Sequence, residues 1–228
     1  MSEHLVVQRS GAVRARARVA GIVYLLFFVT AVAGRALLGL AGADGSPSAI
    51  SADPTRFQVG FGLTLVSIAS YVALTGLLYE LLRPVSRDVA LVAALLSLMG
   101  LALQMVGIVL LGAPLVAAGQ SSLLFLRLAV QFGHAGLVFD GFWLLLLGYL
   151  VFQSTILARG LGALVALAGL GWEVYLAPQL AAQAQTPIDV LGFLAEAALM
   201  VWLLALGFDL GHLLERIGVR RAAKVAKR

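Results

Sequence analysis

The chain has no cysteine, which excludes disulfide bonds, thiolate metal sites and cysteine nucleophiles. Charge is also scarce: 12% of the residues are Asp, Glu, Lys or Arg, where soluble domains carry about a quarter. Histidine occurs three times and proline six times, so imidazole ligands and helix breakers are few. Apolar residues make up 61% of the chain, and their long runs leave too little sequence outside them for a soluble catalytic domain.

Long apolar stretches occupy most of the 228 residues, and the mean hydropathy is +1.01. A helix needs about 20 apolar residues to cross roughly 30 Å of hydrocarbon. We therefore predict an all-α, polytopic membrane protein with a single bundle of six transmembrane helices at 19–211, between a basic arm at 1–18 and a basic tail at 212–228. The six predicted spans are residues 19–41, 58–82, 89–113, 132–153, 161–180 and 190–211.

The basic residues are distributed unevenly over the connections. Of 16 Arg and Lys residues, 13 precede the first span, lie in the second and fourth connections or follow the last span, and the exceptions are Arg35, Arg56 and Arg127. Because basic residues stay on the cytoplasmic side, we predict a protein of the cell (inner or cytoplasmic) membrane with both termini cytoplasmic. The sequence pI of 10.1 then indicates contact with anionic lipids at the cytoplasmic face and not with nucleic acid.

Two segments admit a second interpretation. The arginines at 14–18, the apolar run and Ala31-Val32-Ala33 resemble a cleavable signal peptide, but the run continues to Leu40, which favours an uncleaved helix. Ser121–Gln131 is apolar apart from its Arg and Gln residues. It is either an interfacial segment or a tilted extension of the fourth span.

Several motifs occur in an order that is similar to a known family. They are Ala17-Arg18-Val19-Ala20-Gly21-Ile22-Val23-Tyr24-Leu25, Leu82-Arg83-Pro84-Val85-Ser86, Leu144-Leu145-Leu146-Leu147-Gly148-Tyr149-Leu150 and Ala168-Gly169-Leu170-Gly171. From about Ala17 to Phe208 the chain resembles the bacterial integral-membrane family catalogued as domain-of-unknown-function family 4386. The resemblance implies a membrane architecture and brings no assigned activity.

The same resemblance implies positions of interest. The family tends to carry a histidine before the glycine-aromatic run of the fourth helix and a glutamate in the last helix, and His134 and Glu196 match these positions. Where the family often has an arginine in the third helix, this chain has Ser97. That departure puts any chemistry shared across the family in doubt.

Ionisable residues inside the spans carry the functional signal, because a charge in hydrocarbon costs about 2.5–3.5 kcal/mol and normally faces the bundle interior. The helical rise places most of them in the outer half of the membrane, with one aspartate slightly deeper. We therefore predict an outward-facing polar cavity lined by Arg35, Tyr71, Gln104, Gln131, His134, Asp140, Glu173 and Glu196. The alternative is a structural network, with Arg35 reaching the lipid headgroups and Gln104 bonding between helices.

Three functions remain open for such a cavity. The first, which we favour, is binding or transport of a small polar or amphipathic molecule. The second is a membrane-embedded enzyme acting on a lipid-like substrate, with a divalent metal on His134, Glu173 and Glu196. No His-Glu-x-x-His, Gly-x-Ser-x-Gly or paired-aspartate motif supports it, and we predict no cofactor. The third is an accessory subunit of a membrane complex. Independently of the function, the chain is also expected to form a homodimer.

The predicted orientation can be tested directly, because the native chain offers no competing thiol. A cysteine at Ser48 should react with a membrane-impermeant thiol reagent in intact cells, and a cysteine at Ser86 should not. The reverse labelling pattern would overturn the orientation and place the polar residues in the cytoplasmic half.

Overall fold

The structure of the chain is a computed structural model that describes residues 2–39, 53–115, 120–154 and 157–208. These residues form helices and contain no β-strand. The basic tail at 212–228 and most of the loop before the second predicted span lie outside them. The helices are α1 (Ser2–Leu37), α3 (Pro54–Leu82), α4 (Arg87–Leu111), α5 (Gln120–Gln153), α6 (Arg159–Trp172) and α7 (Pro178–Phe208), with short 3-10 turns η1 (Ala113–Leu115) and η2 (Glu173–Leu176).

Five of the helices are long and apolar enough to cross a membrane. The qualifying segments are Val13–Leu37 of α1, all of α3 and α4, Ser121–Gln153 of α5 and Gln183–Gly207 of α7. Most of their large apolar side chains outside the core are exposed, as expected of surfaces that face lipid. The prediction of an all-helical, multi-pass protein is therefore confirmed, with five candidate membrane-spanning helices in the described residues.

The fifth predicted span, 161–180, is not one continuous helix. α6 has 14 residues, which corresponds to about 21 Å and falls short of a hydrocarbon core of roughly 30 Å. The helix gives way to the 3-10 turn η2 at Glu173, and α7 begins at Pro178. Proline has no N–H to continue a preceding helix and is well suited to a first helical turn. The sixth predicted span consequently starts earlier than residue 190.

The structure also decides between the two interpretations of Ser121–Gln131. This segment is part of α5, which runs without interruption for 34 residues. A helix of that length spans about 50 Å, well beyond the hydrocarbon core. Ser121–Gln131 is therefore an extension of the fourth predicted span. At the other end of the chain, α1 already begins at Ser2, so the basic arm continues the first helix.

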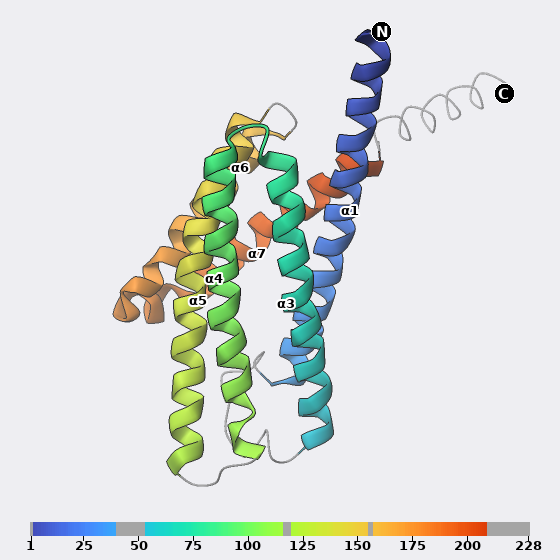
Figure 1. Cartoon of the computed structure of the whole chain (residues 1–228). Coiled ribbons are helices and arrows are strands. Elements are labelled where there is room, and N and C mark those ends of the chain that lie inside the picture. The colour runs from blue at the N-terminus through green and yellow to red at the C-terminus, as the bar shows by residue number, and fades with distance from the viewer. Residues whose placement is uncertain (1, 40–52, 116–119, 155–156, 209–228) are drawn as a thin grey trace, which may run out of the picture.

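The helices form a closed ring in which each packs against its neighbours in the chain. Contacts run from α1 to α3, α4, α5 and α6 in that order, and α7 contacts both α6 and α1. Figure 1 shows α1, α3, α4 and α5 running up and down, while α7 passes obliquely behind them. Through this oblique path α7 completes the ring and brings residues from its middle to the centre of the bundle.

Glycines bring the backbones of α5 and α6 into direct contact. A Cβ built on Gly148 would lie 2.6 Å from the amide nitrogen of Ala166 and 2.6 Å from the carbonyl oxygen of Gly162. A Cβ built on Gly162 would lie 2.6 Å from the amide nitrogen of Phe152. Close packing of this kind is a principal source of helix association in lipid, where apolar burial alone gives little preference for protein over tails.

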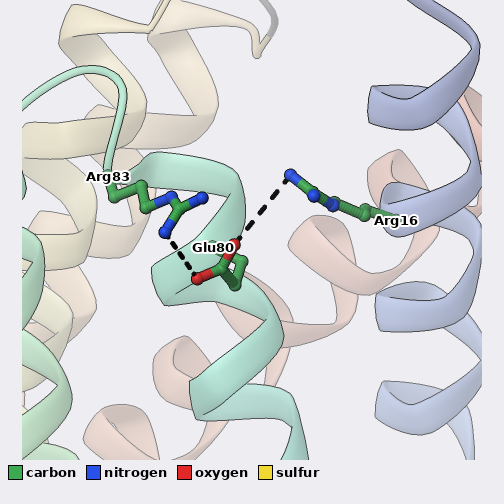
Figure 2. Close-up of polar contacts among 3 residues, drawn as sticks. All are labelled: Arg16, Glu80 and Arg83. Atoms are coloured by element: carbon green, nitrogen blue, oxygen red, sulfur yellow. Dashed lines mark ion pairs between the residues drawn. The ribbon is translucent and has the colours of Figure 1, made fainter. Parts of the chain in front are cut away.

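At the end of the bundle where α1 begins, α1 and α3 are also linked by charge. Glu80 on α3 accepts from Arg83 at 3.0 Å and lies 4.0 Å from Arg16 on α1 (Figure 2). All three side chains are more than a third exposed. Exposed pairs of this type contribute little to stability. Glu80 is therefore a suitable control residue for experiments on the buried acids.

Replacing Gly148 by alanine should weaken the α5–α6 contact. The added methyl group meets backbone atoms that cannot rotate away, and we expect the free energy of unfolding to fall by about 1–3 kcal/mol. The matched control is Gly76→Ala, because a Cβ at Gly76 meets nothing within 4 Å. It should be neutral or stabilising by up to about 1 kcal/mol. Equal unfolding transitions in detergent for the two variants would contradict this packing.

Candidate functional site

Tyr71 lies at the centre of a chain of buried hydrogen bonds that joins three helices. Its hydroxyl on α3 donates to the carboxylate oxygen Oε1 of Glu196 on α7 at 3.3 Å. The indole Nε1 of Trp143 on α5 donates to the same hydroxyl at 3.1 Å. Trp143 is 1% exposed, Tyr71 5% and Glu196 6%. Each group therefore satisfies another inside the bundle, as buried polar atoms require.

A second buried carboxyl group lies beside this chain. Asp140, one helical turn before Trp143 on α5, accepts a short hydrogen bond from Nε2 of Gln104 on α4. Its other oxygen, Oδ1, lies against Gly100 and has no hydrogen-bond partner within the described part of the chain. A larger residue at position 100 would occupy the space of this carboxylate, so the glycine permits α4 and α5 to close around it.

These groups form one set, which we call the polar core: Tyr24, Tyr71, Gln104, Asp140, Trp143 and Glu196. The Tyr24 ring on α1 meets Tyr71 edge-on at 6.2 Å between centroids, and its hydroxyl lies beside Glu196. Asp140 and Glu196 are close enough for their charges to interact. The polar core thus collects side chains from α1, α3, α4, α5 and α7 around two acids.

No basic side chain neutralises these two acids in the described residues. The ion pairs found there involve Glu80 and not Asp140 or Glu196. A buried carboxylate is costly unless it is paired with a charge or accepts hydrogen bonds. The polar core is therefore suited to hold a proton, a cationic group or a ligand that donates hydrogen bonds.

One turn from the polar core, α3 and α4 share a further buried contact. The hydroxyls of Thr75 and Ser97 lie 2.9 Å apart, and Ser97 is fully buried. Ser97 is the position at which the resembled family often has an arginine. In this chain a small hydroxyl fills that position and bonds to α3, so no cation reaches the two acids from there.

A separate group of residues lies toward the end of the bundle where α1 ends. The rings of His134 on α5 and Tyr175 in η2 lie 4.8 Å apart between centroids, and the Tyr175 hydroxyl donates to Asp189 on α7 at 3.2 Å. Arg35, in the last turn of α1, lies within electrostatic range of Tyr175. The side chains of Arg35 and Asp189 are exposed, so this group lies at the surface of the bundle.

The predicted site residues thus occupy different places. Tyr71 and Glu196 are bonded to each other, as are Gln104 and Asp140, within the polar core. The partner of His134 is Tyr175. Arg35 is exposed and lies within electrostatic range of Tyr175, Gln131 is exposed, and Glu173 lies at the break between α6 and η2.

The metal-dependent alternative receives no support from this placement. Across the described ranges, no group of three His, Asp or Glu side chains could hold a metal ion. His134, Glu173 and Glu196 in particular do not form a common ligand set.

Two members of the polar core were not among the predicted site residues. Tyr24 shares a helical stripe with Arg35, and Trp143 follows Asp140 by three residues, so periodicity places each beside a predicted residue. Their roles depend on partners on other helices, which spacing along one helix does not reveal.

The chain matches a family model described as "Domain of unknown function (DUF4386)" over residues 19–207. That range covers most of the chain, and the protein therefore belongs to this family. Searches of curated proteins and of solved structures found no match.

Removing the Tyr71 hydroxyl should destabilise the bundle measurably. Tyr71→Phe leaves the buried Trp143 Nε1 without its acceptor and removes one donor from Glu196, and we expect a loss of about 1–3 kcal/mol in the free energy of unfolding. Tyr149→Phe is the matched control, because Tyr149 is 50% exposed, and it should change stability by less than about 0.5 kcal/mol. Equal effects in denaturant titrations followed by tryptophan emission would contradict the hydrogen-bond chain.

Proposed function

We propose that this member of the family binds or transports a small polar or amphipathic molecule, which it holds at the polar core within the membrane. The observation that carries the proposal is the pair of buried acids, Asp140 and Glu196, without a basic partner in the described residues. Intramembrane acids are costly and are normally retained for a functional reason. A ligand with hydrogen-bond donors would satisfy the free oxygen of Asp140.

A row of aromatic rings supports an amphipathic ligand. Phe193 on α7 is 51% exposed and meets Phe28 at 5.3 Å between ring centroids. Phe28 meets Tyr24 at 5.4 Å, and Tyr24 adjoins Tyr71. The row leads from a lipid-facing surface between α1 and α7 to the hydroxyl that bonds Glu196. A molecule with an apolar part along these rings and a polar part at the acids would match both surfaces.

The broken helix α6 also favours binding or transport over a purely structural bundle. Interrupted helices that end inside the membrane are a recurrent feature of binding sites in transporters, because they expose backbone groups to a bound solute. Here α6 ends after 14 residues, and the first residue of the following turn is an acid.

We also propose that the protein lies in the bacterial inner membrane, with both termini cytoplasmic and with α6 and η2 forming an interrupted fifth crossing before α7. The antiparallel order of α1, α3, α4 and α5 supports this orientation, since the α3–α4 turn with its arginines lies at the end where α1 begins (Figure 1). Basic residues at this end would contact anionic headgroups.

The proposed function predicts that a small molecule purifies with the protein and depends on Glu196. Mass spectrometry of extracts from the detergent-purified protein should detect at least one polar or amphipathic compound at near-stoichiometric amount. Glu196→Gln keeps the side-chain shape but removes the charge, and should reduce that compound at least about tenfold.

Glu80→Gln is the matched control, because it removes an acid that is partly exposed and already paired. It should retain the compound at the wild-type level. Extracts that do not differ between the wild type and Glu196→Gln would contradict the proposal.

A further inference from the structure

Arg35 on α1 and Asp189 on α7 carry opposite charges that the polar core does not use. Both side chains are exposed, and no ion pair joins either of them to another side chain within the described ranges. A charge at the edge of hydrocarbon is costly unless it reaches the headgroups or a partner. Both residues can therefore bind a partner that comes from the membrane.

The contacts between α1 and α7 bring these two charges to the same side of the bundle. A Cβ built on Gly207 would meet the backbone of Arg18, and the ring of Phe193 meets that of Phe28 at 5.3 Å between centroids. The two helices are therefore antiparallel, so later residues of α1 lie beside earlier residues of α7. Both charges lie within the next two turns beyond the two rings, in the direction away from Arg18.

Tyr175 in η2 connects the two charges. Its hydroxyl donates to Oδ1 of Asp189 at 3.2 Å, and Arg35 lies within electrostatic range of it. Its ring lies 4.8 Å from that of His134, and Tyr175 itself is buried. The hydrogen bond fixes the carboxylate of Asp189 and leaves its second oxygen, Oδ2, able to accept from another donor.

The position of this group along the helices matches the level of lipid headgroups. Arg18 is one of the basic residues at the end where α1 begins, and Arg35 lies about 26 Å further along the helix. From Arg159, the first residue of α6, the chain also advances about 26 Å to reach Tyr175. Since a hydrocarbon core is roughly 30 Å thick, this group lies close to the opposite headgroups.

Exposed apolar side chains lie one turn deeper than each charge. Val32, one turn before Arg35, is 56% exposed, and Phe193, one turn after Asp189, is 51% exposed. A lipid whose headgroup met the two charges would place its acyl chains against these side chains. The surface thus follows the order of groups in a phospholipid, with charges of both signs at the headgroup level and apolar contacts beneath them.

We propose that the surface formed by Arg35, Tyr175 and Asp189 binds the zwitterionic headgroup of a phospholipid in the leaflet where α1 ends. The planar guanidinium group of Arg35 donates to the phosphate, and Oδ2 of Asp189 accepts from the ammonium group. Phosphatidylethanolamine carries both groups. Neither Asp140 nor Glu196 takes part, so this site stands whether or not the polar core binds a ligand.

The test compares two lipids that differ in one charge. The full-length protein, delipidated in dodecyl maltoside, is titrated with short-chain phosphatidylethanolamine or with short-chain phosphatidylglycerol, which has the phosphate but no ammonium group. Bound lipid is counted by native mass spectrometry. The midpoint of thermal unfolding is followed in parallel, because a ligand of the folded state raises it. Free phosphoethanolamine is the probe for a soluble headgroup.

The wild type should bind phosphatidylethanolamine saturably, with a half-saturating concentration at least about tenfold below that of phosphatidylglycerol. Arg35→Gln should raise this concentration at least about tenfold for both lipids, whereas Asp189→Asn should weaken only phosphatidylethanolamine and so abolish the preference. Arg127→Gln is the matched control. Arg127 is also exposed but lies about 10 Å beyond His134 along α5, so its loss should leave the response to phosphatidylethanolamine unchanged.

Equal affinity of the wild type for the two lipids would overturn the proposal, as would an undiminished response to phosphatidylethanolamine in Arg35→Gln or Asp189→Asn. Free phosphoethanolamine that binds as tightly as the lipid would also overturn it, because the ligand would then be a soluble molecule. Arg35→Lys keeps the charge but not the planar donor pair, and its affinity should lie between those of the wild type and Arg35→Gln.

Discussion

Helices in a bilayer gain little by burying apolar side chains against one another, because lipid tails are equally apolar, so hydrogen bonds and close backbone approach determine which helices associate. In this bundle the chain from Trp143 through Tyr71 to Glu196 is the contact on which the central arrangement depends. It joins α5, α3 and α7, which do not follow one another in sequence. Together with the Tyr24 hydroxyl beside Glu196, it anchors the oblique helix α7 at the centre of the ring.

The glycines make this arrangement possible by letting neighbouring helices close around acids. Gly100 accommodates the carboxylate of Asp140 between α4 and α5, and Gly141 accommodates that of Glu173 between α5 and η2. A glycine thus makes room for each of these two acids. Because neither acid is paired with a basic residue in the described chain, the structure leaves charge to be compensated by protons or ligands.

Composition and hydropathy were sufficient to predict the class of fold and most of its spans. The apolar runs gave the five long helices to within several residues at most ends, and they identified the intramembrane acids as residues of interest. They could not predict the break at Glu173, because Gly169-Leu170-Gly171-Trp172 is as hydrophobic as a span and the 3-10 turn depends on local backbone geometry. The early start of α7 at Pro178 was also missed, because residues 178–180 were assigned to the fifth predicted span and residues 181–189 to the connection after it.

The sequence identified most of the residues of the candidate site, but it did not show which of them contact one another. Depth along each helix indicated that Arg35, His134, Glu173 and Glu196 lie at a similar level, but depth does not specify the direction in which a side chain points across the ring. The partner of Glu196 is Tyr71, and that of His134 is Tyr175, because α7 is oblique and η2 interrupts α6. Helix tilt and interruption arise from tertiary packing, which a single sequence does not encode in its periodicity.

A double-mutant cycle between Tyr71 and Glu196 tests the central interaction most directly. The free energies of unfolding of the wild type, Tyr71→Phe, Glu196→Leu and the double variant would be measured in one detergent. Bonded side chains in a buried network should show a coupling energy of about 1 kcal/mol. A coupling energy of zero within about 0.3 kcal/mol, the additivity expected of independent sites, would show that α7 does not bring Glu196 to Tyr71 and would contradict the account of the polar core.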